Sequence, residues 1–135
     1  MRLSEIKPIQ ELGSILTAAG VTDTIYTGNK PTSGLPGSYI EIMQNGSYKS
    51  SSSKMGIIEG VLLLSVNVKL LSTGATNIAK EDIVMGKFDS LFENNKNVVS
   101  GSYHFGQDLT NLVYSGRGIS EGYSTKVINL LVKIY

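Results

Sequence analysis

The residue types that could support nucleophilic catalysis meet at one place in the sequence. His104 is the only histidine of the 135-residue chain, Ser102 lies two residues before it and Asp108 four residues after it. No Gly-x-Ser-x-Gly turn surrounds the serine, and a chain of this length contains such triples by chance. One histidine and no cysteine also disfavour a transition-metal site. We therefore predict no catalytic residue and no metal ligand, and we expect His104 to face solvent at a strand end.

Two other patterns resemble parts of known sites but are incomplete. Glu81 and Asp82 are adjacent at a predicted helix start, where helix capping explains them and nothing favours a glycosidase pair. Residues 28–34 lack the Gly-Lys-Ser/Thr that completes a phosphate-binding loop. Residues 74–77 precede a predicted helix and could hold an anion, but a turn from a strand into a helix needs such residues anyway. Residues 116–122 approach a dinucleotide-binding fingerprint but have the wrong spacing. All three glycine patterns are predicted to be turns, and no cofactor is expected.

The segment 44–56 is rich in serine and glycine and carries Tyr48, Lys49 and Lys54 without any acidic residue. Seven of its 13 residues are Ser or Gly, a composition that buries little surface and favours a flexible loop. Two interpretations stay open. The loop contacts a partner or a nearby nucleic-acid backbone, or it is simply solvated.

Composition and charge narrow the class of protein. Twelve basic and 11 acidic residues give a net charge of +1, which argues against binding nucleic acid through a strongly basic surface. The length predicts a single domain over residues 1–135. Neither a signal peptide nor a membrane-spanning apolar run is present, so we expect a protein that is made and folded in a cytoplasm and has no membrane contact.

The first half of the chain predicts a helix followed by two strands. Ile9, Leu12, Leu16 and Ala19 form one apolar stripe, with Pro8 suited to the first turn and Gly20 to the end of the helix. Residues 24–27 and 38–43 are predicted strands, separated by a loop over residues 28–37 that contains two prolines and three glycines.

The clearest pattern is the alternation of apolar residues over 57–71, which predicts a long strand with a bulge or bend at Gly60. With the preceding loop it predicts a hairpin whose tip leaves the domain. A second helix is predicted over 77–94, with Asn77 as its cap. The remaining predictions are strands over 98–105, 109–114 and 127–135 and a loop over 116–122.

These elements predict an α+β fold: an antiparallel β-sheet with two helices packed on one face and a long protruding β-hairpin. The opposite sheet face is only half polar, because Tyr26, Tyr39, Tyr135 and Leu131 lie on it. A partner or a second copy is expected to cover part of that face. Its candidate contact residues are Tyr39 and Tyr135, and those of the loop are Tyr48, Lys49 and Lys54.

This order of elements resembles the tail terminator proteins of long-tailed bacteriophages, also called tail completion or minor tail proteins. The pattern spans nearly the whole chain and contains no catalytic motif. It consists of an amphipathic N-terminal helix followed by segments 25–31, 39–42, 61–71, 88–92 and 127–135. The length and serine content of the 44–56 loop depart from it.

The resemblance implies a structural virion protein and not an enzyme. It implies subunits that form a homo-oligomeric ring, usually a hexamer, which caps the tail tube, ends its polymerisation and offers a surface to the head. The expected partners are other copies of the chain, the tail tube protein and the head-tail connector proteins, with DNA close by in the ring lumen. The expected location is the virion tail, after assembly in the cytoplasm of a host bacterium. The alternatives are a head-tail connector or neck protein, and a small ligand-binding domain or enzyme.

Overall fold

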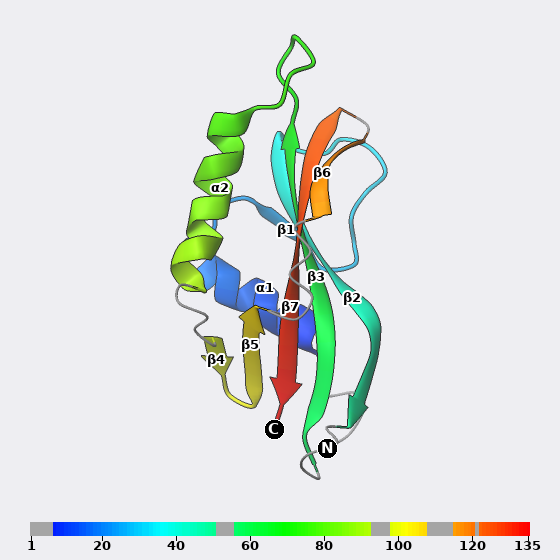
Figure 1. The fold of residues 1–135 in the computed structure, drawn as a ribbon, viewed down its shortest axis with the longest axis vertical. Coiled ribbons are helices and arrows are strands. Elements are labelled where there is room, and N and C mark those ends of the chain that lie inside the picture. The colour runs from blue at the N-terminus through cyan, green and yellow to red at the C-terminus, as the bar shows by residue number, and fades with distance from the viewer. Residues whose placement is uncertain (1–6, 51–55, 93–97, 108–114, 121) are drawn as a thin grey trace.

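The computed structural model describes residues 7–50, 56–92, 98–107, 115–120 and 122–135 (Figure 1). Two helices and seven strands follow one another in an α+β arrangement. Their order is α1 (Pro8–Ala18), β1 (Thr24–Tyr26), β2 (Ser38–Ser50), β3 (Ile58–Lys69), α2 (Ile78–Leu91), β4 (Val98–Ser100), β5 (Tyr103–Gln107), β6 (Ser115–Ser120) and β7 (Tyr123–Ile134).

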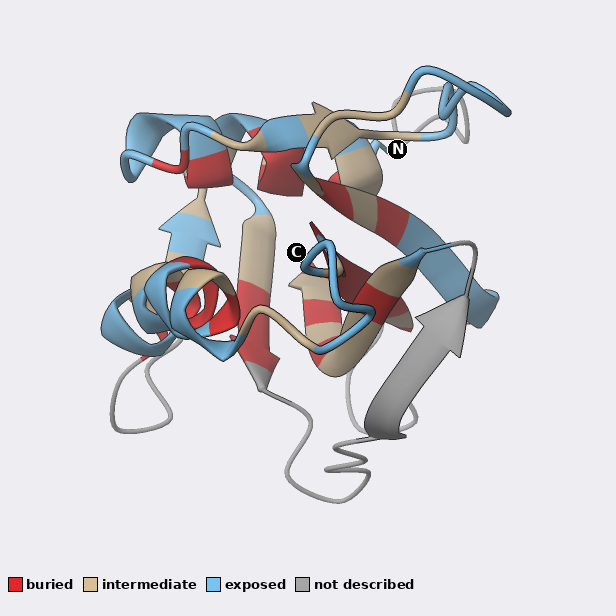
Figure 2. Ribbon diagram, turned by 90° about the horizontal axis from the view of Figure 1, so that it is seen from above, coloured by how far each residue is buried: buried red, intermediate tan, exposed pale blue. Residues whose placement is uncertain are grey.

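All seven strands belong to one curled sheet (Figure 2). Six of them follow the order β1-β2-β3-β7-β5-β4, and β6 pairs with β7 outside this order. The central strand β3 pairs antiparallel with β2 on one side and with β7 on the other. Along β7, β5 pairs with residues 130–134 and β6 with residues 123–127.

The prediction of a purely antiparallel sheet is wrong at one edge, because β1 runs parallel to β2. A parallel neighbour needs a long connection, and the segment between the two strands supplies it. The segment passes Gly28, which has a φ of +107°, and returns so that Thr24 lies opposite Tyr39.

Both predicted helices are confirmed, with ends slightly different from those expected. Pro8 occupies the first turn of α1, and Gly20 follows the helix with a φ of +93°, a conformation that glycine adopts without strain. The side chain of Asn77 accepts a hydrogen bond from the backbone N–H of Lys80 at 3.2 Å, which caps α2. Residues 93 and 94 of the predicted second helix lie outside the described residues.

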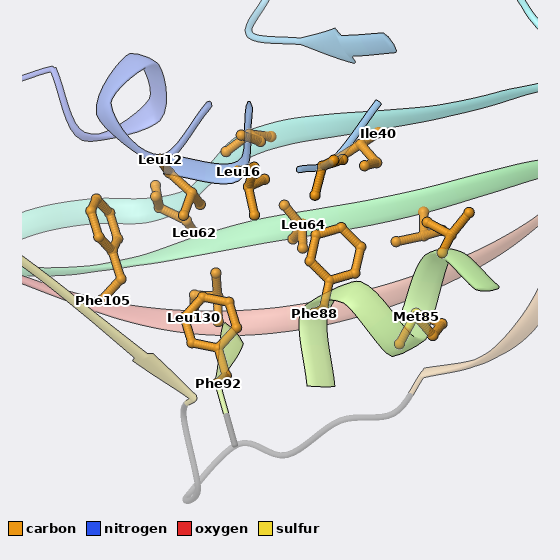
Figure 3. Close-up of a cluster of buried hydrophobic side chains, with 14 of the residues drawn as sticks. Leu12, Leu16, Ile40, Leu62, Leu64, Met85, Phe88, Phe92, Phe105 and Leu130 are labelled. Carbon is orange, nitrogen blue, oxygen red and sulfur yellow. The ribbon is translucent and has the colours of Figure 1, made fainter. Parts of the chain in front are cut away.

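The core is a single cluster of apolar side chains from both helices and from alternate residues of the strands (Figure 3). Leu12 and Leu16 of α1 meet Phe88 of α2 over Leu62 and Leu64 of β3. The predicted alternation in β3 and β7 is confirmed, because their even-numbered apolar residues supply much of this cluster. Fully buried apolar side chains of this size contribute about 2 kcal/mol each to stability before chain entropy is counted.

The loop predicted over residues 44–56 begins later than expected. Residues 44–50 continue β2, because β3 presents a long row of backbone groups with which they can pair. The pairing shifts between Asn45 and Lys49 by two residues of β2, and Gly46 within this bulge has a φ of +80°. Residues 51–55 lie outside the described residues.

The bulge predicted at Gly60 lies on the neighbouring strand: β3 pairs regularly with β7 through that position, and the register shift of β2 between Asn45 and Lys49 lies opposite Gly60. Gly60 instead leaves room for an aromatic ring. A Cβ atom added there would lie 2.0 Å from Cδ1 of Tyr48, which packs over the glycine from β2. The absence of a side chain at Gly60 on β3 therefore makes room for the Tyr48 ring on β2.

The last third of the chain differs from the prediction in two places. The strand expected over 98–105 is a tight hairpin, because Gly101 takes a φ of +57° and turns the chain between β4 and β5. Val98 therefore lies opposite Phe105, and Val99 points to the other face and is exposed. The loop expected over 116–122 contains β6, where backbone pairing with β7 outweighs the turn-like composition. Residues 109–114 lie outside the described residues.

Candidate functional site

A polar depression lies at the end of the sheet where β2 begins. A depression of about 600 Å³ is bounded by the starts of β1 and β2, the end of β3 and the start of α2. Its lining residues include Asp23, Ser38, Lys69, Asn77 and Lys80. The volume falls in the range of small-molecule sites, but such sites are mostly apolar whereas this lining is mostly polar.

Asp23 is the charged centre of this depression. Its side chain is only 4% exposed, and Ser38 Oγ donates a 2.5 Å hydrogen bond to Oδ1. Lys87 Nζ lies 3.4 Å from Oδ2, and Lys80 Nζ lies 3.9 Å from Oδ1. Burial by itself raises the pKa of Asp23, but the Ser38 hydroxyl and the two ammonium groups outweigh it, so the pKa falls below its ordinary value.

This arrangement describes an ionised carboxylate with both oxygens already occupied. A general base needs a pKa near the working pH and a free oxygen, and Asp23 has neither. Its contacts tie β1 to β2 and to α2, which gives it a structural role. The remaining lysine of the depression, Lys69, is exposed at the end of β3.

A second buried carboxylate lies under the first turn of α2. Glu81 is 2% exposed, accepts a 2.5 Å hydrogen bond from Ser124 Oγ and lies 3.4 Å from Lys126 Nζ. Its sequence neighbour Asp82 is exposed. The carboxylate pair that the sequence places side by side is therefore divided between the interior and the surface.

The other face of the sheet carries a cluster of tyrosines at this same end. The rings of Tyr26 and Tyr123 each meet Tyr39 edge to face, with centroids 5.7 and 5.3 Å away. Lys30 Nζ lies 5.6 Å from the centre of the Tyr39 ring, and Tyr123 donates its hydroxyl proton to the carbonyl of Pro36 at 2.7 Å. The loop between β1 and β2 thus covers this part of the sheet.

Tyr39, which was predicted as a partner contact, is therefore not an exposed side chain. Tyr39 is 5% exposed, because residues of its own chain cover it, and this burial raises the pKa of its hydroxyl. Sequence alternation located the correct sheet face. It contained no information about the long loop that folds back over it.

The residues predicted at the hairpin have different environments. Lys49 is exposed near the end of β2, while Tyr48 is half-buried against the core over Gly60, and burial raises the pKa of its hydroxyl. Lys54 lies outside the described residues. Of the two predicted loop contacts that the structure describes, Tyr48 thus packs against its own chain and Lys49 is exposed.

His104 and Tyr135 lie together at the end of the chain. Their ring centroids are 4.4 Å apart, and Tyr135 is 50% exposed. His104 is half-buried, so the prediction that it faces solvent is only partly right. Ser102 occupies the turn between β4 and β5, and Asp108 lies outside the described residues. The described part of this triple forms no hydrogen bond between Ser102 and His104.

Glycine positions and metal ligands add no further site within the described ranges. Gly28, Gly34 and Gly74 all have positive φ, as the predicted turns require, whereas residues 116–120 lie in β6. Among the residues that the structure describes, no group of three or more His, Asp or Glu side chains is placed to hold a metal ion. Neither described helix is long and apolar enough to cross a membrane.

No local sequence pattern identifies the two buried carboxylates, Asp23 and Glu81. Asp23 follows a helix and precedes a short strand, and its partners lie 15 to 64 residues away. Glu81 stands where a helix dipole already accounts for an acid, and its partner Ser124 is 43 residues away. Only contacts between distant elements distinguish these acids from ordinary surface residues.

Comparison with known proteins places the fold but not the activity. No family model matches the chain, and no curated protein matches it. Solved structures do match. One of them, whose description gives no function, superposes with a TM-score of 0.57 over 93% of this chain and 89% of its own, at 15% sequence identity. Such a likeness shows a shared fold and nothing about function.

Proposed function

We propose that the protein is a structural subunit of a phage tail, a tail terminator that assembles into a ring, caps the tail tube and offers a surface to the head. The proposal is supported by the sequence pattern described above and by an α+β fold with one curled sheet and two helices. Carboxylates already bound within the chain make the polar depression a poor catalytic centre, which favours assembly over chemistry.

Two finer features of the fold belong to this proposal. Both helices cover the same face of the sheet, as their shared apolar cluster with the even-numbered residues of β3 supports. The second feature is the long hairpin formed by β2 and β3, whose described strands run over Ser38–Ser50 and Ile58–Lys69. The β3 strand of this hairpin is part of the main sheet, because it pairs with β7 along its whole length from Ile58 to Lys69.

One observation carries the proposal furthest: strand edges that stay open. β1 pairs only with residues 39–41 of β2, so among the described strands none covers the outer edge of β2 from residue 42 to residue 50. On the far side of the sheet, β4 pairs with β5 alone. Ring subunits need two different surfaces, and two unlike edges on opposite sides supply them.

The experiment is to incubate the purified protein with isolated tail tubes of the phage or prophage that encodes it. Negative-stain microscopy is expected to show a ring-shaped density at one end of each tube. Tubes that keep bare ends at saturating protein would contradict the proposal. Rings found only on isolated head-tail connectors would favour the neck protein instead.

The depression around Asp23 favours the remaining alternative, a small ligand-binding domain. If it binds a ligand, screening polar metabolites by NMR should shift the backbone amides of Gly37, Ser38 and Asn77 in a saturable way. Tail-terminator function predicts no such saturation.

A further inference from the structure

We propose that the outward face of α2 docks onto the distal part of β2 (residues 43–50) of a second copy of the chain. This inference rests on the proposed function, because it names the two surfaces that build the ring. Its partner is a second copy of this chain, chosen on charge complementarity between the two surfaces.

The outward face of α2 combines apolar and acidic side chains. Ile83 is 59% exposed, and the exposed Asp82 and Asp89, seven residues apart, lie on the same side of the helix. Neither aspartate forms an ion pair with a described residue. The lysines of the helix do not neutralise them, because Lys80 and Lys87 turn toward Asp23. The face is therefore negatively charged around an exposed apolar side chain.

Gly86 lies at the centre of this face and is exposed. Glycine disfavours a helix interior relative to alanine, so its presence there calls for a steric reason. Within its own chain there is none, because a Cβ atom added at Gly86 would meet nothing within 4 Å. Close approach of another chain at this point supplies the reason, since only glycine lets two backbones come that near.

The distal part of β2 has complementary properties. The register places Met43, Asn45 and Lys49 on one face of the strand, since they pair with the odd-numbered residues 63, 61 and 59 of β3. Met43 is 37% exposed and Lys49 is exposed. Glu59 of β3 lies opposite Lys49 and 3.9 Å from Lys133 Nζ, so this row across β2, β3 and β7 has two lysines against one glutamate and stays positively charged. Lys49 can thus pair with an α2 aspartate while Met43 contacts Ile83.

The two surfaces lie on opposite flanks of the molecule, with α2 on the left and the distal part of β2 on the right in Figures 1 and 2. One subunit can therefore use both at once. A contact between two different surfaces is head-to-tail, and its repetition gives a closed ring when the rotation per subunit closes.

Because the chain has no cysteine, introduced thiols report this contact specifically. Asn45→Cys and Ser90→Cys place one thiol beside each surface and leave Lys49, Gly86 and the aspartates intact. A short bismaleimide added to the double variant is expected to give a ladder of covalent oligomers that ends at one largest species. Asn45→Cys with Ser14→Cys, an exposed position on α1, is the matched control and should give only background. Equal yields from both pairs would overturn the inference.

A second variant separates docking from folding. Gly86→Gln in the same double-cysteine chain adds a side chain at the point where the second chain would approach the helix. It is expected to lower the cross-linked yield by roughly tenfold, as loss of a central interface contact does. The melting temperature should stay the same or rise, because glutamine favours the helix. Ser14→Gln is the control and should change neither quantity. An unchanged yield, or a clear fall in melting temperature, would contradict a docking role for Gly86.

These results stay distinct from those of the tube-capping experiment. A ladder with bare tube ends would overturn the tail terminator function and keep the docking surfaces. Capped tubes with only background cross-linking would keep the function and overturn the docking surfaces.

Discussion

At the end of the sheet where β2 and β7 begin, Asp23 and Glu81 are buried and bound by lysines and serines from other elements. At the opposite end the carboxylates are only partly buried, with Glu11 bound by Ser100 and Glu59 beside Lys133, and aromatic rings close the core. Tyr48 packs over Gly60, and the rings of Tyr103 and Phe105 stack with centroids 6.3 Å apart. We call these the charged end and the aromatic end.

The two ends differ in the interactions that hold them together. Buried charges at the charged end require exact partners, so that end is specific and sensitive to pH. The aromatic end depends on shape and burial, which leaves charged groups such as Lys49 free at the surface. Substitutions at the two ends should therefore differ in how much they lower the free energy of unfolding and in how that loss depends on pH.

The largest effect is expected at Glu81. Glu81→Ala removes the buried carboxylate that Ser124 and Lys126 contact and should lower the free energy of unfolding by about 3 kcal/mol. Urea unfolding followed by circular dichroism measures this. Asp82→Ala, an exposed change one residue along, should stay within about 0.5 kcal/mol. Similar losses for both variants would remove the distinction between the two acids.

The next effect tests the aromatic end. Gly60→Ala forces its new methyl group into the Tyr48 ring and should lower the free energy of unfolding by about 1–3 kcal/mol. Tyr48→Ala in the same chain relieves the clash, so the double variant should lose less than the sum of the single losses. Strict additivity in the same unfolding assay would show that the ring does not pack over this glycine.

A smaller effect with a definite pH dependence is expected at Asp23. Its pKa in the folded chain lies below the ordinary 3.8, so its ionised form stabilises the fold fully above pH 3.8, and this contribution is lost as the pH falls through the folded pKa. Asp23→Asn should cost about 1 kcal/mol at pH 7 and less at pH 3. Unfolding curves at the two pH values test this. A loss of unfolding free energy that is larger at pH 3 than at pH 7 would contradict a lowered pKa of Asp23 in the folded chain.

The smallest effect on folding is expected at Lys49. Lys49→Gln should change the free energy of unfolding by about 0.5 kcal/mol or less, because its side chain is exposed and loses only its cross-strand pairing with Glu59. The same change should weaken association of subunits in sedimentation velocity, most clearly at low salt. A destabilised monomer would mean that the aromatic end, too, depends on charge.

Periodicity predicted those elements whose own residues carry the signal. Alternation over β3 and β7 and the apolar stripes of α1 and α2 gave the two helices and the centre of the sheet. The continuation of β2 past Met43 and the whole of β6 were missed, because their serine- and glycine-rich sequences form strands only through pairing with β3 and β7.

The candidate sites were less predictable than the fold. Lys49 was selected from local charge, and its side chain is exposed. Tyr39 was placed on the right face but is covered by a loop whose path depends on contacts with Tyr123, 84 residues further along. Asp23 was missed because its character comes from partners on β2 and α2, which no local pattern connects.

The central claim is that the protein ends the growth of a tail tube. Its most direct test is light scattering of tail tube protein that is polymerising from a nucleating tip, with this protein added in small molar amounts. The account predicts that elongation stops at a length set by the time of addition, with one ring-shaped cap on each tube. Tubes that continue to grow at the unperturbed rate with saturating protein present would contradict it.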